Sequence, residues 1–415
     1  MINKKLLILA IFLVSLFAIS AVSAADAAIT SEDTDQIGLS SNNDITEDNL
    51  QTSEENSILI QTNDDETLST ETNSQTLNEC EGTYYDLIDE IGDGGDKTLN
   101  KSYYRYTGGD TIEIKNSGVI NGNGAVIDMA GSDIQAFKVT ASGVTINNLT
   151  IKNVNFNGDG GAIIFSSNFC TVENCNFINN TARYSGAILL AKTSNMMISN
   201  CSFMNNSASK SVTSEGGAIY LANSPNTMIS NCSFVNNYAA YFGGAISSMN
   251  CDNTVFSNCS FVKNHAIYSG SAIYFSGNNA HDSINWKISN CSFINHNVAI
   301  GTDGGAVHIT GSYGNLSNSY FVNNSAARAG GAIYCHSNNG CISNCSFVNN
   351  SAARDGGAIW WVGNNGAVST CVFVNNSGRS GGAIGWYGSN GRLSECVLIN
   401  NSASNGIIFF QNSED

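Results

Sequence analysis

The feature that most constrains this chain is a short repeat that recurs through most of its length. A typical copy runs from Ile342 to Phe347 as Ile-Ser-Asn-Cys-Ser-Phe, continues to Asn349-Asn350 and ends in Gly-Gly-Ala-Ile at Ile359. A period of about 25 residues indicates a solenoid, in which each coil buries its apolar face against the next. The second glycine of the repeat, with Ser271 in one slot, falls at Gly161, Gly186, Gly217, Gly244, Gly305, Gly331, Gly357, Gly382 and Gly406.

The residues inside the repeat select the kind of solenoid. Apolar runs are short and rich in Ile, Val, Phe and Tyr, as in Ala218 to Leu221, and Gly and Asn separate them. The spacing of leucine-rich repeats and the 3.6-residue periodicity of helical repeats are absent. Three short strands joined by tight turns account for one period. The sequence therefore predicts an all-β fold, a parallel β-helix whose coils are stacked about 4.8 Å apart.

Alternation along Asn-Cys-Ser-Phe places Cys and Phe on the inner side of the strand and Ser on the outer side. The inner Phe stack comprises Phe177, Phe203, Phe234, Phe261, Phe293, Phe321, Phe347 and Phe373. The inner Cys stack comprises Cys175, Cys201, Cys232, Cys259, Cys291, Cys345, Cys371 and Cys396, with Ser319 in one slot. Parallel, in-register Cβ vectors suit a disulfide poorly, so we expect buried, reduced thiols.

The Asn before each of these cysteines is expected at a bend. Asn tolerates a left-handed backbone, and stacked amides can hydrogen-bond from coil to coil. The expected amide column comprises Asn200, Asn231, Asn258, Asn290, Asn318 and Asn344.

The chain before the repeats divides into three predicted segments. Residues 1–25 carry two lysines, an apolar run and small residues near Ala24, which predicts a cleaved signal peptide, extracellular localisation and no other membrane span. Residues 26–79 are polar and acidic, and predict a disordered tether. Residues 80–97 contain apolar positions at helical spacing, which predict a short helix that caps the first coil. The β-helix is predicted over 98–410, followed by a polar tail at 411–415.

The charge balance excludes some partners. Asp and Glu outnumber Lys and Arg by 34 to 17, for a formal net charge of −17. Such acidity favours solubility and argues against nucleic acid as a partner.

Two combinations of these motifs resemble known families. Gly-Gly-Ala-Ile followed by Phe-x-Asn-Asn is similar to the repeat of chlamydial polymorphic outer-membrane proteins. Together with the Lys-rich start, the acidic tether, the helix near Tyr84 to Ile91 and the segment Asn121 to Asp128, the repeat resembles adhesin-like surface proteins of methanogenic archaea. Over residues 84–410 this resemblance implies an extracellular right-handed β-helix that functions in attachment or cell-surface contact.

Polysaccharide cleavage is the main alternative function. It requires carboxylates on neighbouring coils. The slot two residues before the second glycine holds Asp159, Tyr184, Glu215, Phe242, Ser269, Asp303, Ala329, Asp355 and Ser380. No two acids are adjacent there, and the five histidines lack metal-ligand spacing. We therefore expect no catalytic residue, metal or cofactor. Arg328, Arg354 and Arg379 align one slot earlier on three coils, where they either hold an anionic glycan or are simply solvated.

The residue after each Ala-Ile is expected to point outward. Exposed aromatic side chains in such a column can stack on sugar rings or contact a protein, although packing between neighbours also explains part of it. The candidate binding residues in this column are Tyr220, Tyr274, Tyr334, Trp360 and Phe409.

The sequence thus predicts a secreted, non-catalytic, adhesin-like protein that binds glycans or surface proteins. A polysaccharide lyase or glycoside hydrolase and a passive cell-envelope component remain as alternatives. The last repeat ends in an apolar strand near Phe410 with no capping helix after it. An uncovered strand edge predicts end-to-end self-association.

Overall fold

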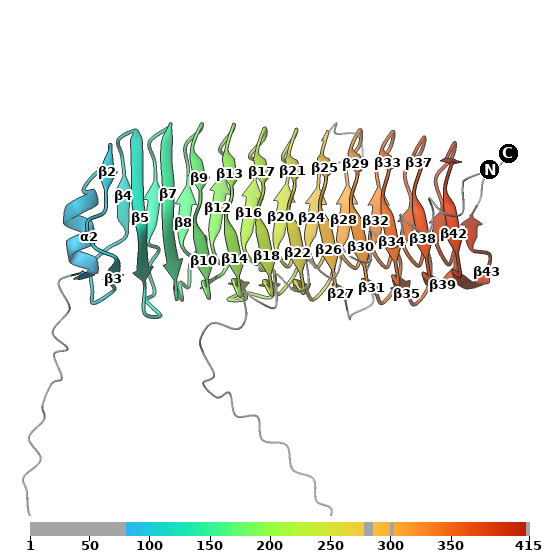
Figure 1. Ribbon diagram of the computed structural model, residues 1–415, viewed down its shortest axis with the longest axis horizontal. Coiled ribbons are helices and arrows are strands. Elements are labelled where there is room, and N and C mark those ends of the chain that lie inside the picture. Colours follow the sequence, from blue (N-terminus) through green and yellow to red (C-terminus); the bar gives the residue numbers. More distant parts are fainter. Residues whose placement is uncertain (1–79, 278–284, 299–302, 412–415) are drawn as a thin grey trace, which may run out of the picture.

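The computed structural model describes residues 80–277, 285–298 and 303–411. These residues form a parallel β-helix of about 12 coils, with roughly 26 residues per coil and almost no helix. Figure 1 shows the coils stacked along one axis, with helix α2 at the N-terminal end of the stack. The predicted fold class is confirmed. The predicted signal peptide, the tether and residues 412–415 of the predicted tail lie outside the described residues.

One parallel sheet takes a single strand from each successive coil, and equivalent residues lie opposite one another, as Ile333 does to Ile359. Its strands are β4 (Ile112–Ile114), β6 (Phe137–Val139), β8 (Ile163–Phe165), β12 (Ile188–Ala191), β16 (Ile219–Ala222), β20 (Ile246–Met249), β24 (Ile273–Ser276), β28 (Val307–Thr310), β32 (Ile333–His336), β36 (Ile359–Trp361), β40 (Ile384–Trp386) and β44 (Ile408–Phe410).

Two further stacks join into one sheet because β5 (Gly118–Asp128) and β7 (Val144–Lys152) each run through both. The first stack continues with β2 (Lys97–Thr98), β9 (Thr171–Glu173), β13 (Met197–Ser199), β17 (Met228–Ser230), β21 (Val255–Ser257), β25 (Lys287–Ser289), β29 (Asn315–Ser317), β33 (Cys341–Ser343), β37 (Ala367–Ser369) and β41 (Arg392–Ser394). The second comprises β1 (Glu81–Thr83), β3 (Tyr103–Arg105), β10 (Asn176–Ile178), β14 (Ser202–Met204), β18 (Ser233–Val235), β22 (Ser260–Val262), β26 (Ser292–Ile294), β30 (Tyr320–Val322), β34 (Ser346–Val348), β38 (Val372–Val374) and β42 (Val397–Ile399).

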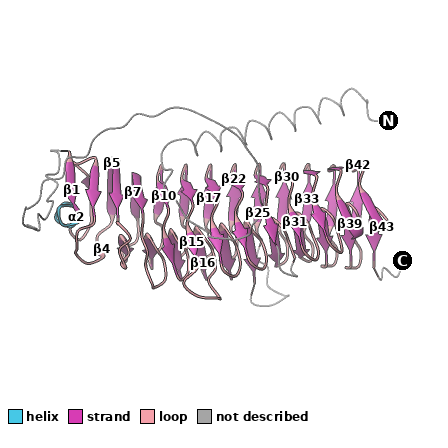
Figure 2. Cartoon of the chain, turned by 90° about the horizontal axis from the view of Figure 1, so that it is seen from below, coloured by secondary structure: helices cyan, strands magenta, loops and turns pink. Residues whose placement is uncertain are grey.

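Short strands close the remaining side of each coil. They are β11 (Thr181–Ala182), β15 (Ser207–Ala208), β19 (Tyr238–Ala239), β23 (His265–Ala266), β27 (Asn297–Val298), β31 (Ser325–Ala326), β35 (Ser351–Ala352), β39 (Ser377–Ser380) and β43 (Ser402–Asn405). Figure 2, viewed from below, shows the same strands repeating from coil to coil over the whole length.

The interior of the β-helix is built from identical residues on successive coils. The predicted Phe stack is confirmed: neighbouring ring centroids lie 4.6 to 5.0 Å apart and the rings are nearly parallel. Every ring from Phe177 to Phe373 is fully buried. Burial of large aromatic side chains is a major source of stability in such a core.

The hydrogen-bonded amide ladder occupies a different column from the predicted one. Asn200 and its equivalents do lie at left-handed bends, with φ near +53°. The ladder forms instead from the second Asn of each Asn-Asn pair. Asn350 Nδ2 donates to Asn376 Oδ1 at 3.0 Å and to the Phe321 carbonyl at 3.0 Å. The prediction chose the wrong Asn because both columns carry turn-forming residues, and only burial separates them.

One coil interrupts this ladder. His296 stands where the other coils have Asn, and it is completely buried. Its Nδ1 lies 3.1 Å from the Asn264 carbonyl and its Nε2 lies 3.1 Å from the Phe261 carbonyl. Burial lowers the pKa of His296 to about 4. A neutral imidazole carries one N–H, so it can donate to only one of these two acceptors.

The Gly-Gly pair is explained by two separate constraints. Gly330 has φ of +67°, a left-handed conformation that disfavours other residues. A Cβ on Gly331 would lie 2.1 Å from the Gly357 carbonyl oxygen of the next coil. The first glycine therefore permits the turn, and the second permits close stacking.

Helix α2 (Tyr84–Ile91) covers the N-terminal end of the stack, as predicted. Thr83 and Asp86 form a capping box, with Thr83 N–H donating to Asp86 Oδ2 at 2.6 Å. Tyr84, Leu87 and Ile91 are fully buried against the first coils. The parallel sheet starts earlier than the predicted residue 98, because β1 and β2 pair with β3 and β5. At the other end, Ile407 and Phe410 are 44% and 48% exposed.

Candidate functional site

The predicted outer column exists and is kept in register by the sheet of β4 to β44. Tyr274 pairs with His308, His308 with Tyr334, and Tyr334 with Trp360. The same column reaches Tyr220 through Ser247 and reaches Phe409 through Gly385. From Tyr220 to Gly385 its side chains point away from the core, because the residues before and after each of them in the strand are buried inside.

These rings are less exposed than the sequence predicted. Trp360 is 8% exposed and Tyr274 is 9% exposed, while Tyr220, Tyr334 and Phe409 are half-buried. Phe242 stacks on Tyr274 with centroids 4.2 Å apart. The rings therefore form a packed layer outside the core. Trp360 in particular is almost completely covered, although it lies outside the core.

His308 joins the aromatic side chains into one continuous surface. Its ring centroid lies 5.0 Å from that of Tyr274 and 4.6 Å from that of Tyr334. Desolvation beneath these neighbours lowers the pKa of His308 to about 4, so the imidazole is neutral at pH 7. Desolvation also raises the pKa of Tyr274 to about 12. The surface is thus uncharged along its centre.

A second aromatic cluster lies beside this column and was missed by sequence reasoning. The Tyr241 centroid lies 3.9 Å from that of Phe242 and 4.9 Å from that of Tyr268. Tyr184 stacks on Tyr220 at 5.4 Å. Tyr184, Tyr241, Phe242 and Tyr268 lie in the turn before the second glycine, where other coils carry residues from Ala and Ser to Arg. The signal that could have revealed the cluster is large residues at a position that otherwise varies.

Three arginines flank the same face, in the alignment that the sequence predicted. The Arg354 N–H donates to the Arg328 carbonyl at 2.9 Å, and the Arg379 N–H donates to the Arg354 carbonyl at 2.6 Å. Arg328 Nε donates to Asp303 Oδ1 at 2.8 Å, and its Nη2 contacts Oδ2. Arg354 and Arg379 are exposed and form no ion pair with any described residue. Two of the three guanidinium groups are therefore available to an anion.

The carboxylates of this face are isolated from one another. Ala329 separates the coils of Asp303 and Asp355, since Ala329 pairs directly with Asp355. Glu215 is 8% exposed and accepts a hydrogen bond of 2.8 Å from Ser247 Oγ. Burial raises the pKa of Glu215. Among the described residues, no group of three or more His, Cys, Asp or Glu side chains could hold a metal ion.

The predicted Cys column is buried, except that Cys396 is half-buried, and all thirteen cysteines are free thiols. The structure also shows why the bend needs a small acceptor. The Cys345 N–H donates to Cys371 Sγ on the next coil at 3.4 Å. Where Ser319 replaces Cys, the Cys291 N–H donates to Ser319 Oγ at 3.1 Å instead. The column therefore satisfies backbone donors that the strands leave unpaired.

The β-helix also matches a known protein family. Residues 105–325 match the family described as right handed beta helix region. The chain belongs to this family. Residues 318–336 and 344–360 also match the Chlamydia polymorphic membrane protein repeat, as the sequence motif indicated. No curated protein matches the sequence. No helix in the described part of the chain has the length and apolar character needed to cross a bilayer.

Solved structures similar to this chain have low sequence identity to it. PfbA, a surface adhesin of Streptococcus pneumoniae, is 13% identical, with 77% of this chain and 92% of that chain covered and a TM-score of 0.46. A PL6 alginate lyase in complex with a trisaccharide is 12% identical, with 81% and 88% covered and a TM-score of 0.46. The catalytic domain of a GH87 alpha-1,3-glucanase is 12% identical, with 81% and 67% covered and a TM-score of 0.43.

Proposed function

We propose that this protein is an extracellular, non-catalytic attachment protein that binds acidic glycans through the outer face of the sheet β4 to β44. The observation that carries the proposal is the pair of unpaired guanidinium groups, Arg354 and Arg379, on adjacent coils beside the continuous ring surface. Guanidinium groups bind carboxylates in a bidentate manner, and aromatic rings offer a flat apolar surface to sugars.

The electrostatics define how such binding would behave. The chain carries a formal net charge of −17, so an anionic glycan is repelled by the rest of the molecule. Binding must then depend on the local arginines, and it should weaken steeply as salt screens them. Extracellular placement is part of the proposal, since the predicted signal peptide lies outside the described residues.

The test measures binding of the purified chain to oligogalacturonate and to oligoalginate by calorimetry. The double variant Arg354→Gln/Arg379→Gln should lose about 10- to 100-fold in affinity, as expected for two charge-assisted contacts. Arg392→Gln in β41 is the control, because it removes one exposed arginine from a different strand. Equal losses in both variants would contradict a specific face. Binding to surface proteins but to no acidic glycan would replace the glycan by a protein ligand.

A polysaccharide lyase is the second candidate, and one cluster favours it. Neutral His308, Tyr334 and the Arg328–Asp303 pair lie on two adjacent coils. A neutral imidazole can accept a proton. However, burial raises the pKa of Tyr334, which opposes a role for this phenol as a base. Ultraviolet detection of unsaturated sugar ends during incubation with the same polymers separates the two functions, and we expect no release.

A further inference from the structure

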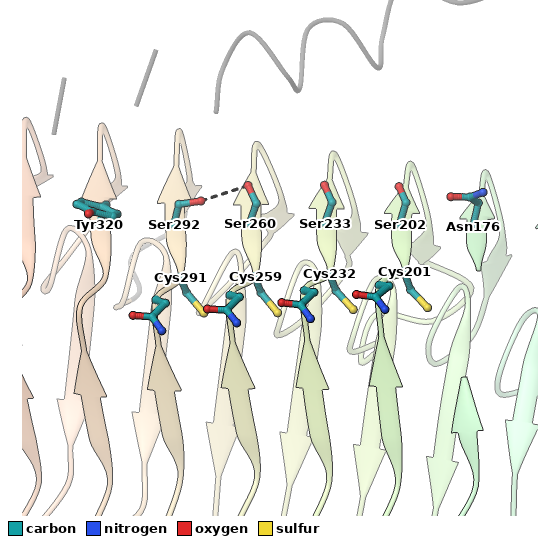
Figure 3. Close-up of a pocket in the computed structure, with 14 residues that line it drawn as sticks. Asn176, Cys201, Ser202, Cys232, Ser233, Cys259, Ser260, Cys291, Ser292 and Tyr320 are labelled. Atoms are coloured by element: carbon teal, nitrogen blue, oxygen red, sulfur yellow. Dashed lines mark hydrogen bonds between the residues drawn. The ribbon is translucent and has the colours of Figure 1, made fainter. Parts of the chain in front are cut away.

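A second surface, on a different side of the coil from the aromatic column, forms a shallow groove along the β-helix axis. It has a volume of about 440 Å³ and follows the bends between β13 and β14, β17 and β18, β21 and β22, and β25 and β26. Each coil contributes the same three residues, Asn, Cys and Ser, as in Asn231 to Ser233. Figure 3 shows the Ser side chains in one row, with Asn176 at one end and Tyr320 at the other.

The polar side chains of the groove are available to a ligand. Asn200, Asn231 and Asn258 form no side-chain hydrogen bond with any described residue, and neither do the hydroxyls of Ser202 and Ser233. In contrast, exposed asparagines elsewhere bind each other, as Asn390 Nδ2 does to Asn365 Oδ1 at 3.0 Å. Within the groove, Ser292 donates to Ser260 at 3.2 Å. The groove thus presents amides and hydroxyls that the fold itself does not use.

The spacing of these groups restricts the occupant. Register places Ser202, Ser233, Ser260, Ser292 and Tyr320 opposite one another on successive coils. Successive coils of a parallel sheet are about 4.8 Å apart, whereas an extended peptide advances only about 3.3 Å per residue. A hexose unit in an extended β-linked chain has a length close to one coil step. Successive sugars of such a chain alternate in orientation, so a polysaccharide can repeat its contacts at every second coil, whereas the residue spacing of an extended peptide does not match the coil step.

The charge of the groove restricts the occupant further. No Asp, Glu, Lys or Arg side chain lines it. Nucleic acids bind through cationic side chains that neutralise phosphate, so this surface does not suit them. Acidic polysaccharides likewise find no cation here. The chemistry that remains is hydroxyl and amide recognition of an uncharged polymer, with the ring of Tyr320 available to stack on the last sugar.

We propose that this groove binds a neutral, extended β-linked polysaccharide along the axis of the β-helix, with about one sugar unit per coil. The Ser hydroxyls and Asn amides hydrogen-bond the sugar hydroxyls on successive coils. This inference does not rest on the proposed binding of acidic glycans, because the two surfaces share no residue.

The test measures affinity of the full chain for cellulose and chitin oligosaccharides, from the disaccharide to the octasaccharide, by calorimetry. A periodic site predicts that affinity for at least one series increases with each added sugar and levels off at about six units, when the groove is filled. No measurable binding of any series, or binding that is independent of chain length, would overturn the proposal.

Variants locate the binding on the molecule. Ser233→Phe places a ring in the middle of the groove and should reduce hexasaccharide affinity at least 10-fold. Met228→Phe on the same coil is the control, since Met228 is 45% exposed on β17 and lies outside the groove. Tyr320→Ser, which restores the serine of the row, should weaken the hexasaccharide several-fold and leave the trisaccharide unchanged. This second variant keeps the test decisive if Ser233→Phe fails to fold.

The two binding proposals fail separately. Arg354→Gln/Arg379→Gln should not change binding of the neutral hexasaccharide, and Ser233→Phe should not change binding of oligogalacturonate. If the arginine variant abolished both, the neutral sugars would bind the outer face and the groove proposal would be wrong.

Discussion

The interior ladders and the outer face of the sheet β4 to β44 follow opposite rules. Inside, almost every coil carries the same residue at the same place, as in the Phe stack and in the ladder of Asn350 and Asn376. Outside, one column holds Tyr, Ser, His, Trp and Gly in turn. Identity is required where one coil must stack on the next, because backbone and side chain must meet in register. Variation is allowed on the outer face, where the side chains lie outside the stacked core, and that is where specificity can arise.

The largest difference between the two regions should appear in stability. Phe347→Ala removes a fully buried ring from the middle of the stack and should cost about 3–5 kcal/mol in free energy of unfolding. Tyr334→Ser, on the half-buried outer face, should cost about 1 kcal/mol. Urea denaturation of both variants measures the two values. Equal losses would mean that the outer face belongs to the core.

A smaller loss is expected from the amide ladder. In Asn350→Ala, the Asn324 N–H loses its acceptor, Asn350 Oδ1, which lies 3.0 Å away. The Phe321 carbonyl loses its donor, Asn350 Nδ2. An unsatisfied buried group costs about 1–3 kcal/mol, and relaxation of the turn offsets part of this cost, so we expect a net loss of about 2 kcal/mol. Asn200→Gly is the control, since it keeps the left-handed bend and removes an exposed amide. A stability loss in the control as large as that in Asn350→Ala would place the ladder in the originally predicted column.

The smallest effect tests the position at which His296 interrupts the amide ladder. His296→Asn should restore the ladder and stabilise the protein by about 1 kcal/mol at pH 7. In the natural protein, burial lowers the pKa of His296 from 6.5 to about 4, so the unfolded chain binds the proton more readily than the folded chain does. The stability of the natural protein is therefore complete above about pH 6.5 and decreases as the pH falls toward 4.

Thermal unfolding across this range distinguishes the two proteins. The His296→Asn variant should lose less stability between pH 6.5 and 4 than the natural protein does. A parallel decline of both curves would show that His296 does not carry the pH dependence.

The predictability of each feature follows from the same contrast. The Phe and Cys columns, the arginine alignment and the helix at Tyr84 to Ile91 were predictable, because each depends on local periodicity that the chain repeats. The amide ladder was misplaced, since Asn344 and Asn350 are identical in type and only the burial of Asn350 separates them. The low exposure of the Trp360 side chain could not be predicted, because it depends on contact of the ring with Gly385 of the next coil. The groove beside Ser233 was not predicted, because an outward serine carries no signal of its own.

The central claim is that the outer face binds without cleaving. The most direct measurement follows the chain incubated with polygalacturonate and alginate, recording bound protein and newly formed reducing or unsaturated ends in the same sample. We expect saturable binding that is lost in Arg354→Gln/Arg379→Gln, with no increase in ends over time. A steady release of ends that disappears when His308 is replaced by Ala would contradict it and identify the face as a catalytic site.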